Sequence, residues 1–549
     1  MNSKKKDIFG VYMIFSDLVL YNGKIVTMDS KDSIAEGVAV YFNKIIAVGN
    51  NSNIQNVIGK ETKVIDLKGR TVIPGLIDSH GHFLTVGSDR KIYVDLSEEA
   101  GINSIADIQT RLREKAKTTP SGDWIFGYQE DDSKLKEKRH PFRWELDEIS
   151  KDHPILITTV GSHFWMANTK AFELVGITKD TPDPVGGKFD RDPGTGGLTG
   201  GLHETAYNIL RPEGLPMPTR EQAYNGALQI LKECASVGLT CIYDLVSEIS
   251  IRAAIDLKNE GKLPIRVRMD ISIELIDELS KLGIYRGLGD DWLRICGLKY
   301  FFDGAISART AAVSKPYLNK PDFYGVMSTT KDIAIKVLNK AYKMGYRISA
   351  HANGDRAIEI YLDIMEELQS KYPRPDPRNR DIHCTVINDR LVERIKELGI
   401  LPTIFGAYPY YHGDKLIPAF GEERLESMFA ARSFLDAGVK ISAHSDHPCS
   451  PYQPLMAIHA LVNRKTKLGE KIGQSQKISV KEALKLYTTH AAYHSFDENN
   501  LGSIEPGKLA DMVILGEDIL TIPTERIIDI PIDMTIIDGR IIYNRANVP

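Results

Sequence analysis

The chain has 549 residues, 42% of them hydrophobic and 26% charged, with a formal net charge of −4. That length exceeds one ordinary domain, so two or three structural units are expected. The near balance of acidic and basic residues argues against the basic surface typical of nucleic-acid-binding proteins and of proteins recruited to anionic membranes.

The sequence also bears on the compartment in which the protein works. Its five cysteines are scattered and none forms a C-x-x-C pair, which predicts reduced thiols packed in the core. Three lysines at positions 4–6 precede the apolar stretch 8–15, but this stretch is short for a signal peptide and no A-x-A cleavage site follows it. No segment approaches the ~20 apolar residues that span a bilayer. We therefore expect a cytoplasmic protein without a cleaved signal.

Short strands are expected at both ends of the chain. Apolar runs between residues 18 and 48 are separated by Asn-Gly, Asp-Ser and Asn-Lys turn signals. The same pattern returns only between residues 510 and 543. It predicts one small β-sandwich domain composed of residues 1–70 and 500–549. Two unrelated hairpin caps are the alternative.

Residues 71–499 alternate short apolar strands with amphipathic helical stretches, a pattern typical of parallel βα units. Eight such strands predict an α/β fold with a (β/α)8 barrel of the TIM type. They are residues 71–77, 154–160, 240–245, 293–302, 347–350, 381–386, 400–405 and 439–443. The segment 267–273 is a further candidate for one of these places.

Two stretches interrupt the βα repeat. The one near 84–150 is charged and helical, and the one near 180–215 is rich in Gly, Pro and Asp. We interpret both as insertions at the loop end of the barrel, where such segments often carry function. They would form either a lid or plain surface excursions.

His80 and His82 close the first predicted strand of the barrel, in Val72-Ile-Pro-Gly-Leu-Ile-Asp-Ser-His-Gly-His82. Residues two apart in an extended backbone point the same way. The pair therefore aims two imidazoles at one point, as a first-row metal requires. Two polar residues in an exposed loop are the alternative interpretation.

Further polar residues fall at the ends of later strands. His351, His383 and Asp446 lie at strand ends, and Lys299 lies within the apolar run 295–302, where a lysine without a partner is costly. The carboxyl ends of the strands form the functional face of such a barrel. A single strand-end histidine is more often structural, but the agreement of five strand ends favours a metal site.

On these residues the chain resembles the amidohydrolase superfamily of metal-dependent hydrolases. Within it, the chain resembles the YtcJ-like branch, which includes N-substituted formamide deformylases. The resemblance covers nearly the whole chain from about residue 16. The matching segments are residues 72–82, 297–304, 350–357, 442–448 and 501–514.

The resemblance implies one or two divalent metals, which we expect to be zinc. His80, His82 and Asp446 would bind one metal, and His351 and His383 would bind the second. Lys299 falls where relatives carry a carboxylated lysine that bridges the metals. The modification would be needed for Lys299 to bind metal, because an unmodified ammonium repels cations. The resemblance also implies a small-molecule substrate and suggests a homodimer; nucleic acids and membranes are not expected partners.

The activity expected from this metal site is hydrolysis of a carbon–nitrogen bond in an amide, N-formyl or cyclic amide substrate. A divalent metal lowers the pKa of bound water and so supplies hydroxide near neutral pH. Asp446 would take the proton of the attacking water and return it to the leaving amine. Four other residues would contact the substrate or orient the ligands: His163, Asp303, Asp355 and His444.

Three alternatives to amide hydrolysis stay open. A deaminase with one metal usually has a glutamate three residues after the strand-5 histidine, where this chain has Gly354. An esterase would use the same metal chemistry. A barrel without activity would act as a scaffold or regulator, although such proteins usually lose ligands that this chain retains.

Overall fold

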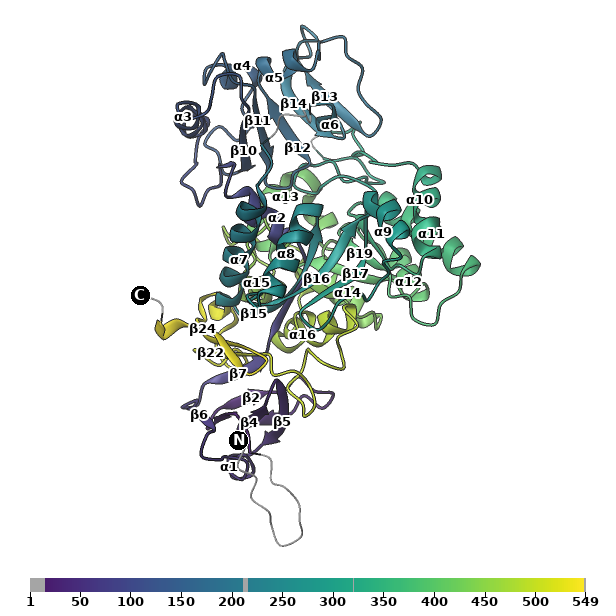
Figure 1. The fold of residues 1–549 in the computed structure, drawn as a ribbon. Coiled ribbons are helices and arrows are strands. Elements are labelled where there is room, and N and C mark those ends of the chain that lie inside the picture. The colour runs from purple at the N-terminus through teal and green to yellow at the C-terminus, as the bar shows by residue number, and fades with distance from the viewer. Residues whose placement is uncertain (1–14, 211–215, 319, 548–549) are drawn as a thin grey trace.

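The structure is a computed structural model that describes residues 15–210, 216–318 and 320–547. The three N-terminal lysines and most of the apolar stretch 8–15 lie outside the described residues. In Figure 1 a mixed sheet lies at the top, a barrel in the middle, and the sheets that contain the chain ends at the bottom. Among the described residues, no helix is long and apolar enough to cross a membrane.

Eight parallel strands form the central sheet and follow one another in chain order. They are β8 (Leu76–Gly81), β15 (Leu239–Val246), β16 (Arg266–Ser272), β17 (Leu293–Phe301), β18 (Ile348–Ala352), β19 (Arg380–His383), β20 (Leu401–Phe405) and β21 (Ser442–His444). The first and last strands meet just beyond β21, where Asp446 N donates to His80 O at 3.0 Å and His82 N donates to His447 O at 2.9 Å. The predicted α/β class is thus confirmed as a nearly closed, eight-stranded parallel barrel.

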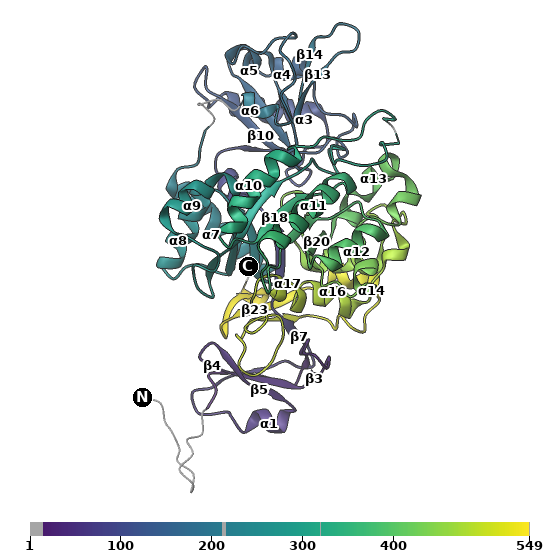
Figure 2. The same ribbon diagram turned by 90° about the vertical axis from the view of Figure 1, so that its right-hand side faces the viewer.

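Amphipathic helices cover the outside of the barrel, as Figure 2 shows for α10, α11 and α12. In α11 the buried residues include Ile358, Tyr361, Leu362 and Met365, which follow helical spacing. The helices that connect or flank the barrel strands are α2 (Phe83–Asp89), α7 (Arg220–Ser236), α8 (Glu248–Asn259), α9 (Ile276–Leu282), α10 (Lys331–Lys343), α11 (Asp355–Lys371), α12 (Asp389–Glu397), α13 (Tyr408–Leu425), α14 (Ala431–Asp436), α15 (Pro454–Asn463), α16 (Val480–Leu486) and α17 (Thr489–His494).

One predicted barrel strand was wrong. The segment 154–160 forms β11 (Ile155–Thr159), which lies in a separate six-stranded sheet. Its place in the barrel belongs to β16, the segment at 267–273 that was the further candidate. Both segments are buried, and the long-range pairing that distinguishes them leaves no local signal in either one.

The two stretches predicted as insertions contribute strands to this same sheet, so we name it the insertion sheet. Its strand order is β13-β14-β12-β11-β10-β9. The strands are β9 (Val94–Asp95), β10 (Ile125–Glu130), β11, β12 (Phe164–Ala167), β13 (Gly187–Arg191) and β14 (Leu198–Glu204), with helices α3 (Ile105–Ala116), α4 (Arg143–Asp147), α5 (Thr169–Leu174) and α6 (Tyr207–Leu210). The insertion sheet lies at the top of Figure 1, above the barrel.

Strands from both chain ends pair below the barrel. A four-stranded sheet has the order β5-β4-β1-β6, and a six-stranded sheet has the order β24-β23-β22-β7-β2-β3. The N-terminal members are β1 (Leu18–Tyr21), β2 (Lys24–Val26), β3 (Ile34–Ala35), β4 (Gly37–Tyr41), β5 (Lys44–Gly49), helix α1 (Asn51–Gln55), β6 (Lys63–Asp66) and β7 (Thr71–Pro74); the C-terminal ones are β22 (Met512–Leu515), β23 (Ile532–Ile537) and β24 (Arg540–Asn544). One apolar cluster includes Leu20 and Val38 of the first sheet and Val72 and Met512 of the second.

The predicted strand 71–77 divides at Gly75 into β7 and β8. The first part pairs with β22 below the barrel, and the second is the first barrel strand. A Cβ on Gly75 would lie 2.2 Å from Thr240 Oγ1, so only glycine fits this close approach. The histidine pair is therefore carried into the barrel by a strand that is anchored in the sheet below it.

Buried arginines lie near the amino ends of the barrel strands. Arg266 Nε and Nη2 donate to the two oxygens of Asp511, each at 2.8 Å. Arg268 Nε donates to Asp497 Oδ2 at 2.7 Å. Both arginines are fully buried, and their carboxylate partners come from the C-terminal part of the chain. This arginine network joins the end of the chain to the barrel.

Candidate metal centre

The six predicted ligands gather at the carboxyl ends of the barrel strands. His80 lies near the end of β8, Lys299 in β17, His351 in β18 and His383 at the end of β19, and Asp446 follows β21. These five residues are at most 6% exposed. The side chain of His82, just beyond β8, is 29% exposed. Because parallel strands end at one edge, side chains from distant segments meet there.

Asp446 is the link between the first histidine pair and the rest of the cluster. Its Oδ1 lies 3.3 Å from His80 Nε2 and 3.4 Å from His82 Nε2. Lys299 Nζ lies 3.0 Å from His80 Nε2. The two histidines of the His-x-His pair thus point at the same carboxylate oxygen, as their spacing predicts.

His351 and His383 form the other side of the cluster. His383 Nε2 lies 3.2 Å from His351 Nδ1, and the two rings meet edge to face with centroids 4.4 Å apart. One ligand atom each from His80, His383 and Asp446 lie within 4.8 Å of one another. This trio draws residues from both predicted metal positions, so the two positions are contiguous.

The backbone at this centre adopts conformations that side chains rarely take. His383 has φ 82° and Asp446 has φ 56°. Such angles are uncommon for residues other than glycine and persist where the surrounding structure enforces them, often at functional sites. Both residues are proposed ligands, so the strain lies where side-chain direction is decisive.

Burial sets the protonation of the histidines. It lowers the pKa of His80 well below the ordinary value, and the nearby Lys299 ammonium lowers it further. Burial also lowers the pKa of His351 well below the ordinary value, and the charge of His163 lowers it further. Burial lowers the pKa of His383 in the same way. All three imidazoles are therefore neutral at physiological pH, which is the form that binds metals.

The pKa values of Asp446 and Lys299 are both lowered, which keeps Asp446 charged and allows Lys299 to lose its charge. Burial opposes ionisation of Asp446, but His383, His80 and His82 outweigh it and hold the pKa of Asp446 well below its usual range. Burial lowers the pKa of Lys299 to about 7, although Asp446 and Asp270 partly oppose the change. A carboxylate and a lysine that can lose its proton therefore face each other within one cluster.

The donor set fits a divalent metal. Asp446 Oδ1, the atom that both histidines of the His-x-His pair approach, is buried and has no hydrogen-bond partner among the described residues. Buried polar atoms are normally satisfied, so open ones indicate a ligand. Nitrogen and carboxylate oxygen suit zinc, whose bonds to them are about 2.0–2.2 Å long. Neutral imidazoles and an ionised carboxylate complete the requirements.

The structure separates Asp303 from Asp355. Asp303 Oδ1 lies 3.8 Å from His351 Nε2, and its carboxylate accepts hydrogen bonds from Asn353 N at 2.9 Å and Gly354 N at 2.8 Å. It therefore holds the loop that follows His351 and β18. Asp355 instead accepts hydrogen bonds from Ser314, and among the described residues no hydrogen bond or ion pair joins it to a predicted ligand.

His163 and His444 lie beside the cluster. The ring of His163 is 5.1 Å from that of His351, and its Nδ1 lies 2.7 Å from Glu204 Oε2. Although His163 follows β11 and so belongs to the insertion sheet, it still reaches the barrel centre. The ring of His444 is 5.0 Å from that of His383, and both of its nitrogens lack a partner among the described residues.

Two buried carboxylates were not expected from the sequence. Asp78 accepts hydrogen bonds from His80 N at 3.1 Å and Ser445 N at 3.1 Å, which fixes the first and last barrel strands to each other. Burial raises the pKa of Asp78 to about 7. Its position two residues before His80 in an apolar strand was the available signal. Glu204, the partner of His163, had no such signal, because it lies 41 residues away along the chain.

Comparison with known proteins agrees with this geometry. A model of the Amidohydrolase family matches residues 63–543. The chain is 28% identical to "Putative amidohydrolase YtcJ" of Bacillus subtilis over 96% of this chain and 99% of that protein. It is equally 28% identical to "N-substituted formamide deformylase" of Arthrobacter pascens, with the same coverage.

Solved structures give the same result for the fold. The structure of an uncharacterized metal-dependent hydrolase from Pyrococcus horikoshii superposes with a TM-score of 0.73 at 28% identity. The match covers 92% of this chain and 99% of that one.

Proposed function

The chain belongs to the Amidohydrolase family, and from that premise we propose that it hydrolyses a C–N bond in an amide, N-formyl or cyclic amide substrate. Its family and its structural neighbours make it a metal-dependent hydrolase. The observation that carries the narrower proposal is the cluster of His80, His383 and Asp446, whose ligand atoms lie within 4.8 Å of one another. The relative named as a formamide deformylase supports an amide-type bond.

We assign the ligands by their contacts. His80, His82 and Asp446 would hold one divalent metal, for which zinc is our choice, and His351 and His383 would hold a second. Lys299, 3.0 Å from His80 Nε2, would bridge the two as a carbamate. The pKa of about 7 favours this modification, because a neutral amine is the form that reacts with carbon dioxide.

When bound, the metal would acidify water and polarise the substrate carbonyl. Asp446 is placed to accept the proton of the attacking water, because its depressed pKa keeps it ionised. It would then return that proton to the leaving nitrogen as the C–N bond breaks. A positioned acid–base group of this kind contributes about 10²–10⁴-fold to rate.

The neighbouring side chains would orient these groups. Glu204 holds His163 Nδ1, so the opposite edge of that imidazole is left to contact substrate above His351. Asp303 fixes the loop after His351 through the backbone N–H groups of Asn353 and Gly354, and it also accepts a hydrogen bond from Ala312 N. His444 packs beside His80 and His383 and would limit the space around the metals.

Further parts of the proposal concern the whole protein. Residues 1–70 and 500–549 would act as one β-sandwich domain, supported by the apolar cluster that both lower sheets share. Residues 71–499 would form the hydrolase barrel with its insertions. We also propose a cytoplasmic enzyme that acts on a small molecule and forms a homodimer.

A substrate screen tests the proposed function. The protein, reconstituted with zinc, would be incubated with N-formyl, N-acyl and cyclic amides, with matched esters and with aminopurines as comparison substrates. Amine release from at least one amide, dependent on Asp446, is the expected result. Turnover of esters or aminopurines with no turnover of any amide would contradict the proposal.

A further inference from the structure

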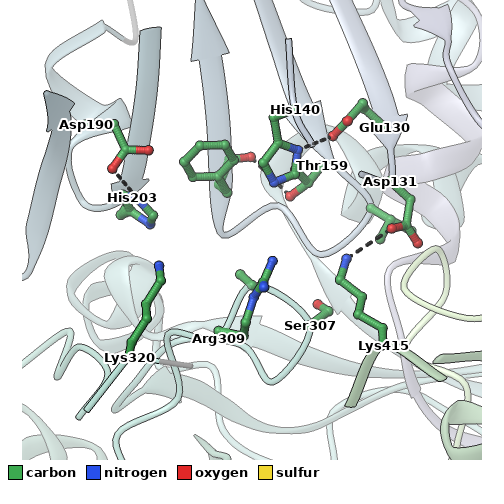
Figure 3. A pocket seen from close by; sticks show the side chains of 13 residues that line it. Glu130, Asp131, His140, Thr159, Asp190, His203, Ser307, Arg309, Lys320 and Lys415 are labelled. Atoms are coloured by element: carbon green, nitrogen blue, oxygen red, sulfur yellow. Dashed lines mark hydrogen bonds and ion pairs between the residues drawn. The ribbon is translucent and has the colours of Figure 1, made fainter. Parts of the chain in front are cut away.

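A polar cavity of about 130 Å³ lies between the insertion sheet and the barrel. Figure 3 shows Lys320, Arg309 and Lys415 extending into it from the barrel side, opposite His203 and His140 of the insertion. A pocket that encloses a whole small-molecule ligand usually measures about 300–1,000 Å³. This cavity is therefore large enough for one end of a substrate only.

The cations on the barrel side differ in how far they are paired. Lys415 Nζ lies 2.5 Å from Asp132 Oδ1 and 3.0 Å from Asp131 Oδ1, so its charge is matched. Arg309 has one contact, from Nη2 to Asp132 Oδ2 at 3.3 Å. Lys320 has no ion pair within the described part of the chain. Lys320 and Arg309 thus retain donors for a ligand.

The opposite wall carries carboxylates that already have partners. Glu130 Oε2 lies 2.8 Å from His140 Nδ1, and Asp190 Oδ1 lies 2.9 Å from His203 Nε2. Two buried atoms of these pairs, Glu130 Oε1 and His203 Nδ1, have no hydrogen-bond partner among the described residues. Glu130 is fully buried. This wall is thus held by its own ion pairs.

Lys320 lines the cavity but is also exposed to solvent, and it lies near other cations. Partial burial of its ammonium lowers the pKa of Lys320, and the neighbouring charge of Arg309 lowers it further. Asp190 opposes this shift but does not reverse it. Two cations that repel each other in a polar cavity are stabilised by an anion between them.

The cavity adjoins the metal centre through two chain segments. Val160 lines the cavity and accepts a hydrogen bond from Cys449 Sγ at 3.5 Å, and Cys449 N donates to Asp446 O at 2.7 Å. Ser307 also lines it, in the loop whose Gly304 O lies 3.3 Å from His351 Nε2. The cavity and the metal centre are therefore adjacent, with these two segments between them.

We propose that this cavity seats a carboxylate of the substrate, held by Lys320 and Arg309, while the scissile C–N bond lies at the metal centre. A monoanion fits better than a phosphate dianion, because Asp190 and Glu130 on the facing wall would repel additional charge. The preferred substrates are then amides that carry a carboxylate, such as N-acyl amino acids. This specificity rests on the proposed hydrolase function.

Matched substrate pairs test the carboxylate site. N-formyl and N-acyl amino acids would be compared with their C-terminal primary amides, which differ only in charge. We expect kcat/KM to favour the acids by about 10- to 100-fold, as for hydrogen bonds to charged groups. Lys320→Met should lower that ratio by about tenfold through KM. Lys315→Met removes an exposed charge near Lys320 in sequence that does not line the cavity, so this control should keep the wild-type ratio.

Binding measurements separate this proposal from the proposed function. Calorimetric titration with the same acids and amides would detect the site even without turnover. Selective acid binding that Lys320→Met weakens, with no hydrolysis of any amide, would support the carboxylate site and contradict amide hydrolysis. Hydrolysis with equal kcat/KM for acids and amides, or equal affinity for both, would overturn the carboxylate site and leave the hydrolase function standing.

Discussion

The barrel contains two clusters of buried charged residues, one at each end, and they differ in how they are satisfied. At the amino ends, Arg266 and Arg268 have their guanidinium groups paired with Asp511 and Asp497. At the carboxyl ends, Asp446 Oδ1 has no hydrogen-bond partner in the described part of the chain. One cluster is complete within the protein, whereas the other is open.

The difference separates stability from chemistry. A fully paired buried cluster contributes to folding but offers nothing to a ligand, and leaving one partner alone is strongly destabilising. An open cluster is tolerated where something else completes it. The same division between the two faces is the rule for barrels of this kind. We therefore expect variants at the two ends to fail in different ways.

The largest expected effect is on turnover, at the open end. Asp446→Asn keeps the shape of the side chain but removes the proton acceptor, so kcat should fall by about 10³-fold or more. Metal should stay measurable in this variant, and its melting temperature should stay near that of the wild type. Steady-state kinetics and a thermal melt would check both. Turnover close to wild type would remove Asp446 from the role of base.

The next effect is on stability, at the paired end. Arg268→Met leaves Asp497 buried with only Arg294 as a charged partner, and breaking a buried pair costs about 3–5 kcal/mol. We expect a loss near the lower limit because Arg294 remains. Urea unfolding would measure it, with Arg268→Lys as the control that keeps the charge. A variant with unchanged unfolding free energy but reduced kcat would contradict the division between the two ends.

A smaller effect is expected at Lys299, which lies in the open cluster. If its carbamate bridges two metals, Lys299→Ala should reduce the metal content by one ion per chain and lower kcat/KM by about 10- to 100-fold. Elemental analysis and kinetics on the reconstituted variant would show this. Two ions per chain in the variant would rule out the bridging role.

The smallest effect concerns acid pH at the paired end. Burial raises the pKa of Asp497, but Arg268 and Arg294 outweigh it, so the pKa lies below the ordinary value of 3.8. Since the folded pKa is lower than the unfolded one, the ion pair stabilises the protein above pH 3.8 and progressively less below it. The difference in unfolding free energy between wild type and Arg268→Met should therefore become smaller as the pH falls below 3.8. If the difference in unfolding free energy did not change with pH, protonation of Asp497 would not control the strength of this ion pair.

The sequence predicted the open end of the barrel better than the paired end. The ligands lie at or near the carboxyl ends of apolar strands, and the period of two in a strand places His80 and His82 on one side. Such features depend on neighbouring residues only. The arginine network depends on partners far away along the chain, since Arg268 and Asp497 are 229 residues apart. No local pattern could have paired them.

The same reason accounts for the strand that was assigned wrongly. β16 carries Arg266, Arg268 and Asp270 among its apolar residues, so its sequence does not resemble that of a buried strand. Its charges can be buried only because distant residues pair with them. β11 begins with the apolar run Ile155-Leu-Ile and is buried throughout, so its sequence resembles that of a barrel strand. Lys320 and Arg309 were missed likewise, because the cavity that they line exists only where the insertion sheet meets the barrel.

Metal content tests the central claim most directly. Wild type, Arg268→Lys and the double variant His80→Ala/His383→Ala would be stripped with a chelator, reconstituted with zinc, desalted and analysed by mass spectrometry for bound metal. The account predicts one or two ions per chain in wild type and in Arg268→Lys, and almost none in the double variant. Wild-type protein that takes up no divalent ion, or a double variant that binds as much as wild type, would contradict it.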